Sequence, residues 1–232
     1  MKTKKIKKKV DNNLFSENQK NKIIEEVKKY AYEHQPMLNS NIKRIKDNKI
    51  LEDKIRKNIL NTLEKIIKKT KRTTSPDELT SIFLENYYAH DVKDRNLYID
   101  GYANQKKAEM NIGELLELYI QKECYQLGWY CTGTIIEDVD FIKKKGNSWE
   151  LHQIKNSDNT ESKAASKTRD FFESKHGTII NKWSRRDSKS GLETYLDKKK
   201  ITNLYYWNTF PEKNLSEKGF REFISNYFKN LS

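Results

Sequence analysis

The stretch VDFIKKKGNSWELHQIKN, residues 139–156, decides the fold of this chain. It holds two short apolar runs joined by a lysine- and glycine-containing segment that is typical of a hairpin turn. Residues two apart in a strand face the same side, so Gln153 and Lys155 project together. If the two runs pair antiparallel, Asp140 lies beside the end of the second run. The pattern therefore predicts an acid, an amide and an ammonium group close together at one end of a sheet.

The segments around this hairpin predict a helix, three strands, a polar helix-compatible region, a fourth strand and a last helix. Three consecutive strands form a meander, and a helical crossover to the fourth strand allows a parallel pairing. We therefore expect an α/β (α+β) fold with a mixed β-sheet flanked by helices. The predicted elements are a helix over 112–127 stopped by Gly128, strands over 129–136, 138–143, 148–155 and 201–210, and a helix around 220–228.

The N-terminal part of the chain predicts helices. Apolar residues at helical spacing indicate a helix from Glu17 to His34, which Pro36 closes. A second stripe predicts one long helix, or a broken pair, over 41–72, and Ser75 is a strong helix start. We expect a basic, mainly helical N-terminal region over residues 1–72 and a second domain over 73–232, whose core covers about 110–210.

The charge of the chain is unevenly distributed. The 232 residues carry a net charge of +13, and residues 1–72 hold 22 Lys/Arg against 9 Asp/Glu, whereas the remainder holds 24 of each. Lysine and arginine displace the condensed counterions of nucleic acids, so a strongly basic region favours a DNA partner. The alternative is a solvated surface in a lysine-rich proteome.

No apolar run approaches the ~18 residues that span a bilayer, and no apolar stretch of a secretory signal follows the first lysines. Cys124 and Cys131 match no metal-ligand or disulfide spacing. These features predict a soluble protein of the cytoplasm.

The Asp140, Gln153 and Lys155 set suits phosphodiester hydrolysis. Asp140 would hold a divalent cation, Mg²⁺, which offsets phosphate charge and lowers the pKa of a bound water. Lys155 would orient or deprotonate that water, and Gln153 would offer the metal an oxygen. Because Gln153 is neutral, another acid is needed, and we favour Glu117 over Glu114 in the preceding helix. The alternative is a solvated strand edge with unrelated charges.

The order of elements around an acid-bearing and a lysine-bearing strand resembles the PD-(D/E)XK nuclease core, in a D…QxK variant. The segments IGELLELYI, GWYCTGTIIEDVDFI, HQIKNSDNTESKAASKTRD and GTIINKWSRRDSKSG together resemble the SinI-type family of type II restriction endonucleases, over residues 110–192. The resemblance implies a restriction-endonuclease-like core and catalytic roles for Asp140, Gln153, Lys155 and Glu117. Of these, Asp140, Gln153 and Glu117 would bind the metal.

The residues after Lys155 favour contact with DNA, because amide and hydroxyl side chains alternate there with cations. The candidate DNA-binding residues are Asn156, Asn159, Lys163, Lys167, Arg169, Lys182, Trp183, Arg185 and Arg186.

We interpret the chain as a sequence-specific, Mg²⁺-dependent endonuclease of double-stranded DNA. It is expected to be a homodimer with two symmetric active sites, and to have a cognate DNA methyltransferase as its genetic partner. Two alternatives remain at this stage. One is a nuclease of the same fold with a repair or mobile-element role. The other is a non-enzymatic basic DNA-binding protein, in which Asp140 and Lys155 form only an ion pair.

Overall fold

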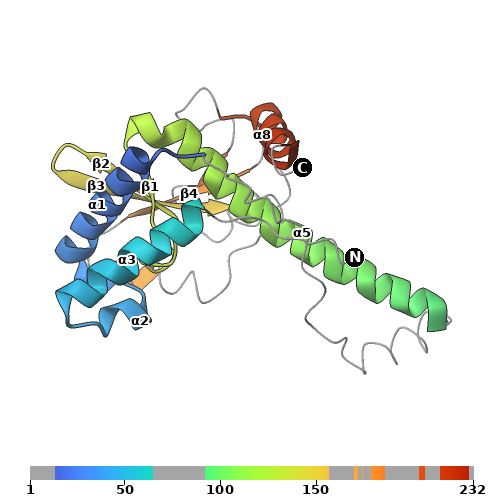
Figure 1. The fold of residues 1–232 in the computed structure, drawn as a ribbon, viewed down its shortest axis with the longest axis horizontal. Coiled ribbons are helices and arrows are strands. Elements are labelled where there is room, and N and C mark those ends of the chain that lie inside the picture. The colour runs from blue at the N-terminus through green and yellow to red at the C-terminus, as the bar shows by residue number, and fades with distance from the viewer. Residues whose placement is uncertain are drawn as a thin grey trace, which may run out of the picture. The chain divides into compact units, whose positions relative to one another are not determined.

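A five-stranded mixed sheet is the centre of the fold (Figure 1). It is seen in a computed structural model of the chain, which describes residues 14–64, 92–156, 170–171, 174, 179–185, 204–206 and 215–229. The strands follow one another in the sheet in chain order: β1 Trp129–Cys131, β2 Phe141–Lys145, β3 Ser148–Lys155, β4 Ile180–Ser184 and β5 Leu204–Tyr206. The first three are antiparallel and the last two join in parallel. The predicted mixed α+β fold is thereby confirmed.

The predicted hairpin is present in the sheet, but its first strand is β2 at Phe141–Lys145 and not the predicted 138–143. Lys145 pairs with Ser148, so Gly146 and Asn147 form a two-residue loop. Gly146 has a φ of 59°, a conformation that glycine adopts at little cost and that two-residue hairpins require. This loop sets the register that brings Phe141 opposite His152 at the other end of the strand pair.

Two predictions about strands were wrong. The predicted strand over 129–136 ends at Cys131, because Gly133, at a φ of 57°, turns the chain out of the sheet. The strand after the crossover is β4 at Ile180–Ser184, which the polar interpretation of this region missed, and β5 lies within the predicted 201–210. Ile180 and Trp183 of β4 are buried, so tertiary packing and not hydrophobic periodicity selects this strand.

The N-terminal helices are α1 Glu17–Glu33, α2 Ser40–Lys43 and α3 Asn48–Leu63, with a 3₁₀ turn η1 at Gln35–Met37. Ser16 and Gln19 form a capping box at the start of α1. Asn39 caps α2 and Asp47 caps α3, so the predicted stripe over 41–72 begins as a broken pair of helices. The predicted helix start at Ser75 lies outside the described residues.

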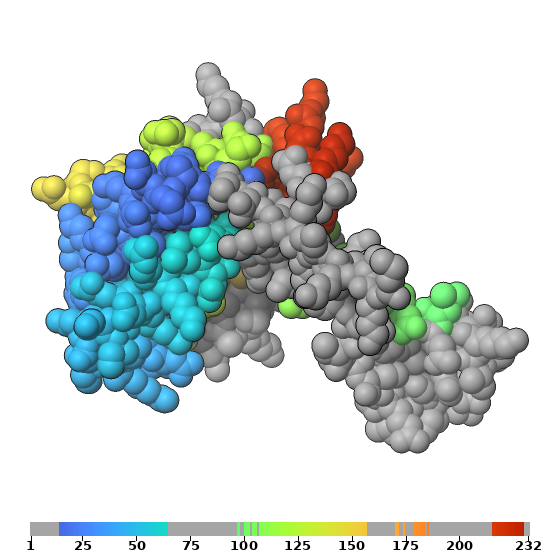
Figure 2. Space-filling view, in the orientation of Figure 1, coloured from blue at the N-terminus to red at the C-terminus, as the bar shows by residue number. Residues whose placement is uncertain are grey.

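α1 packs against α3 and against strand β1 of the sheet. The two helices run side by side (Figure 1), and their side chains meet without a gap in the space-filling view (Figure 2). The buried ammonium group of Lys20 on α1 pairs with Glu64 at 2.7 Å and with Glu17 at 2.8 Å. Trp149 at the start of β3 donates through Nε1 to Glu33 Oε2 at 3.0 Å. The N-terminal helices therefore pack as part of the same compact unit as the sheet.

The chain divides into two compact units. One holds Met1–Lys65 together with Leu116–Ser232, and the other holds Ile66–Leu115. The helices α1 to α3 thus belong to the same unit as the sheet. The proposed boundary at residue 72 stays a prediction.

Two helices complete the described structure. α5 spans Val92–Cys124 and so begins well before the predicted residue 112, and α8 spans Glu217–Lys229. After a 3₁₀ turn η2 at Tyr125–Leu127, Gly128 at a φ of 77° ends the helical segment as predicted. The Tyr119 ring of α5 stacks on Phe220 of α8, with 5.5 Å between centroids. Among the described helices, none is long and apolar enough to cross a membrane.

Gln121 attaches the end of α5 to the edge strand. Its Nε2 donates to the Trp129 carbonyl at 2.9 Å, and its Oε1 accepts from the Cys131 N–H at 2.6 Å. Gln121 is fully buried, so its amide satisfies backbone groups of β1 that would otherwise be exposed at a sheet edge.

Candidate active site

Asp140 lies at the point where β2 leaves its regular register. Its N–H donates to the His152 carbonyl at 2.9 Å, although the Cα partner of His152 is Phe141. Two residues of one strand therefore face one residue of the next, which is the arrangement of a β-bulge. Bulges redirect a side chain at the end of a strand, and here the redirected side chain is the carboxylate of Asp140.

The carboxylate of Asp140 is hydrogen-bonded to the backbone of β3. Its Oδ2 accepts a hydrogen bond from the Ile154 N–H at 2.6 Å, midway between Gln153 and Lys155 in the chain. Burial raises the pKa of Asp140 above its usual range. The bond from Ile154 and the charge of Lys155 oppose that rise, and the charge of Asp138 adds to it. The predicted proximity of Asp140 and Lys155 is thus seen in the structure.

Gln153 lies beside Asp140 in the sheet and is only 4% exposed. In the parallel register its partner is Lys182 on β4, which is also buried, so the two side chains share a face of the sheet. The Gln153 amide makes no hydrogen bond to any residue in the described part of the chain. Its oxygen is therefore available to another ligand at the site.

Lys155 ends β3 and is half-buried. Its register partner is Ser184, and its carbonyl accepts from the Arg185 N–H at 3.1 Å. Because residues 153 and 155 are two apart in a regular strand, their side chains face the same side, as the sequence predicted.

Two further acids flank this group. Burial is the main cause that raises the pKa of the Cys131 thiol, and the charge of Glu117 adds to the rise. Glu117 on α5 therefore lies near β1, the strand that contains Cys131. Asp138 was not among the predicted residues, and its charge acts on Asp140 directly. It has a φ of 56°, which is uncommon for a residue other than glycine. The only sequence signal for it is an acid two residues before Asp140.

The donor atoms fit a hard divalent cation. Asp140 and Gln153 offer oxygen ligands, which Mg²⁺ prefers, and the Gln153 oxygen lacks a partner among the described residues. Within the described ranges, no cluster of three or more His, Cys, Asp or Glu side chains could hold a metal ion. Since Mg²⁺ keeps several waters and binds substrate phosphates, a site with few protein carboxylates suits it.

The predicted DNA-binding residues divide into four groups. Asn156 directly follows Lys155 and is half-buried. Lys182 and Trp183 lie in β4 with buried side chains, and Trp183 Nε1 donates to His152 Nδ1 at 2.9 Å. Arg185 lies 3.6 Å from Glu217 and covers the Phe220 ring of α8. The others, Asn159, Lys163, Lys167, Arg169 and Arg186, lie outside the described residues.

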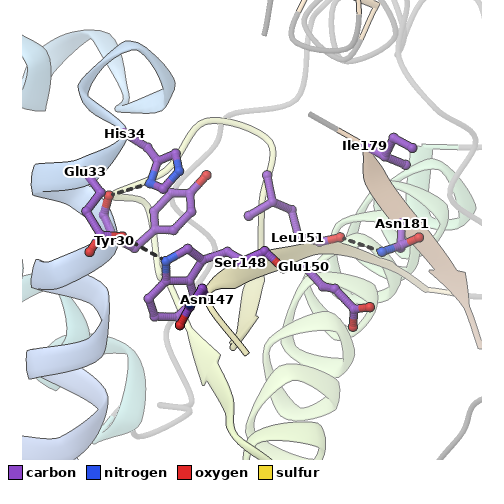
Figure 3. Close-up of a pocket in the computed structure, with 10 residues that line it drawn as sticks. Tyr30, Glu33, His34, Asn147, Ser148, Glu150, Leu151, Ile179 and Asn181 are labelled. Carbon is purple, nitrogen blue, oxygen red and sulfur yellow. Dashed lines mark hydrogen bonds between the residues drawn. The ribbon is translucent and has the colours of Figure 1, made fainter. Parts of the chain in front are cut away.

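A pocket of about 710 Å³ opens at the other end of β3 (Figure 3). Tyr30 and His34 stack at 4.2 Å between ring centroids along one side, and Trp149 and Leu151 line it from the sheet. Its lining contains neither Asp140 nor Lys155. This pocket is therefore distinct from the group of residues around Asp140.

Comparisons with known proteins identify relatives of this chain. The family model described as SinI restriction endonuclease matches residues 10–230. The chain is 37% identical to the Type II restriction enzyme Eco47I of Escherichia coli and 33% identical to the Type II restriction enzyme SinI of Salmonella infantis, each over 171 residues. Each match covers 71% of this chain and 66% of the relative, so the chain spans just under two thirds of the length of these relatives.

Proposed function

The chain belongs to the SinI restriction endonuclease family, and from this membership we propose that it hydrolyses double-stranded DNA at a specific sequence. One observation supports particular residues for this reaction. The carboxylate of Asp140 is hydrogen-bonded to the backbone of β3, next to Lys155. An acid and an ammonium group at adjacent strand ends suit phosphodiester hydrolysis.

Asp140 and Gln153 would hold a divalent cation, which we expect to be Mg²⁺, with Glu117 as the third residue of the site. When bound, the cation supplies positive charge next to the scissile phosphate. The bulge and the Ile154 N–H hold one carboxylate oxygen of Asp140 on β3, so its second carboxylate oxygen would be the one offered to the cation. The all-oxygen donor set supports this assignment.

Lys155 would act on the attacking water. Its ammonium lies close enough to Asp140 to oppose the rise in the pKa of that acid. In this position Lys155 can orient the water, accept or release its proton, and stabilise the negative charge that develops on the phosphate.

We further propose that the protein acts as a homodimer, since two symmetric active sites are needed to cut both strands of a symmetric duplex site. Asn156, Asn159, Lys163, Lys167, Arg169 and Arg186 are the proposed DNA contacts. A cognate DNA methyltransferase would protect host DNA, and cleavage would take place in the cytoplasm.

The experiment is cleavage of plasmid DNA by the full chain in Mg²⁺. Discrete, reproducible fragments support site-specific restriction. A smear or structure-specific nicking would instead indicate a repair or mobile-element nuclease, and intact but shifted DNA would indicate a binding protein without activity.

Two variants connect the activity to the site. Asp140→Asn and Lys155→Ala are each expected to slow cleavage on the order of 10²- to 10³-fold, while binding to cognate DNA in Ca²⁺ persists. Lys144→Ala, at an exposed position of the same hairpin, is the control and should cleave normally. Near-normal cleavage by the Lys155→Ala protein would remove Lys155 from the mechanism.

A further inference from the structure

The loop that carries Asp140 is closed at its base by Thr132. The Thr132 N–H donates to the Asp140 carbonyl at 2.9 Å, and the Thr132 hydroxyl donates to the Val139 carbonyl. Thr132 is fully buried, as are the apolar side chains of Ile135 and Val139 within the loop. Residues 132–140 therefore form an ordered catalytic loop whose position determines where Asp140 lies.

The N-terminal segment before α2 pairs with residues 135–137 of this catalytic loop. The Asn39 N–H donates to the Ile135 carbonyl at 3.0 Å, and the Glu137 N–H donates to the Met37 carbonyl at 3.1 Å. Leu38 and Ile136 form an antiparallel bridge between these two bonds. The loop is thereby paired, like a short strand, with residues about 100 positions earlier in the chain.

Asn58 on α3 holds the catalytic loop at a second place, Thr134. Its Nδ2 donates to Thr134 Oγ1 at 2.6 Å, and its Oδ1 accepts from the Thr134 N–H at 3.0 Å, so one side chain bonds both the backbone and the side chain of Thr134. The neighbouring Gly133 has no Cβ, and a Cβ there would overlap Asn58 Oδ1 and come within 2.9 Å of Thr62 Oγ1. The backbone of the loop therefore lies directly against side chains of α3 at this point.

We propose that Asn58 is a positioning residue for catalysis, which holds the catalytic loop so that the Asp140 carboxylate stays at the end of β3. The proposal rests on the proposed nuclease function. It also assigns a role to the N-terminal helices: they fix the geometry of the active site, in addition to any contact of the basic residues with DNA.

The bulge makes this positioning necessary. Asp140 lies outside the regular ladder of β2, so the pairing of the strands alone does not set the direction of its side chain. A displacement of 1 Å in a reacting group can cost on the order of 10²-fold in rate. The three contacts at Thr134, Ile135 and Glu137 restrain the loop against such a displacement.

The test uses the full-length protein with Asn58→Leu, which keeps the size of the side chain but removes both hydrogen bonds. Asn61→Ala, at an exposed position of the same helix, is the matched control. Single-turnover cleavage of cognate DNA is measured as a function of Mg²⁺ concentration, together with DNA binding in Ca²⁺. Thermal unfolding of every variant is recorded alongside.

We expect Asn58→Leu to lower the single-turnover rate by on the order of 10-fold to 10²-fold and to raise the half-saturating Mg²⁺ concentration, with DNA affinity unchanged. A merely structural role would lower the amplitude of cleavage through loss of folded protein, without a change in rate constant or Mg²⁺ requirement. Asn58→Asp should restore most of the rate, because its carboxylate can accept from both the N–H and the hydroxyl of Thr134.

Thr134→Val gives a second measurement if Asn58→Leu fails to fold. It removes the hydroxyl and keeps the backbone bond, so a smaller shift in the same two parameters is expected. Normal rate and normal Mg²⁺ dependence in the folded variants would overturn the positioning role while the nuclease function stands. If Asp140→Asn also cleaves DNA normally, the assignment of Asp140 to the active site fails. If the unaltered protein leaves plasmid DNA intact in Mg²⁺, the proposed function itself fails.

Discussion

The carboxylate of Asp140 accepts a hydrogen bond from the backbone N–H of Ile154, with 2.6 Å between Oδ2 and N. An ordinary antiparallel ladder would satisfy that N–H with a carbonyl, and here a side chain does so. One carboxylate oxygen is thereby fixed on the strand that carries Gln153 and Lys155. The other oxygen remains to bind a ligand.

Gln153→Glu is expected to lower the Mg²⁺ concentration for half-maximal cleavage. The substitution adds a carboxylate next to Asp140. One added charge at a few ångströms contributes roughly 1 kcal/mol at the dielectric of water, or about fivefold in affinity, and more in a buried site. Lys182, the register partner of residue 153, will pair with part of that charge and limit the effect. The measurement is a Mg²⁺ titration of the cleavage rate.

The matched control for this change is Gln126→Glu, at an exposed position of η2. An equal shift in both proteins would mean that net charge is responsible. In that case the assignment of Gln153 to the metal site would be wrong.

Asn156→Ala is expected to relax discrimination at a single base position by roughly 1–3 kcal/mol, because an amide next to Lys155, the proposed catalytic lysine, can read a base edge. Arg185→Ala should leave the preference among sequences unchanged, since Arg185 contacts Glu217 and Phe220 of α8. Binding affinities for the cognate site and for single-base variants of it measure both. Uniform weakening by Asn156→Ala would make Asn156 a phosphate contact.

The stability of the protein should fall as the pH drops below about 6.5, partly through His152. Burial, with a smaller contribution from the charge of Lys143, lowers the pKa of His152 from 6.5 to about 3. Between these values the unfolded chain binds a proton that the folded protein excludes. The free energy of unfolding therefore decreases with falling pH, by at most about 1.4 kcal/mol per pH unit from this group.

His152→Phe keeps a ring stacked on Trp129 and removes the titrating group. It leaves the Trp183 N–H without its acceptor, so the variant should be less stable at pH 7. Its free energy of unfolding should nevertheless depend less on pH between 6.5 and 4. Urea denaturation at several pH values gives the two slopes, and identical slopes would contradict the prediction.

Gly133→Ala tests the close approach of α3 to the catalytic loop. A methyl group at this position overlaps Asn58, and its backbone is held at a φ of 57°. We expect the overlap to cost about 1–3 kcal/mol in the free energy of unfolding, in addition to the backbone strain.

Gly146→Ala separates the two costs. Gly146 has a φ of 59° but open space around its Cβ position, so only the backbone strain applies there. Denaturant unfolding of the two proteins should differ by the cost of the overlap. Equal destabilisation would show that the loop and helix can move apart freely.

The sequence alone predicts the parts of the fold that depend on local chemistry. The alternation in residues 148–155 predicts β3 and places Gln153 and Lys155 on one face. Gly128 ends the helical segment, because only a residue tolerant of positive φ continues the chain there. Asp140 was identified beside the end of β3 on the same basis, from strand periodicity and a hairpin turn.

The strand β4 and the restraints on Asp140 depend on tertiary structure. β4 contains a buried lysine, Lys182, so its sequence lacks the alternation that marks a strand, and only the parallel pairing with β3 selects it. The bulge at Asp140 and the contact between Asn58 and Thr134 join positions up to 76 residues apart. Such contacts leave no periodic signal in the chain, because they come from the packing of separately formed elements. Local sequence thus determined which residues lie together at the end of β3, and the packing of the N-terminal helices decided how the loop before Asp140 is held.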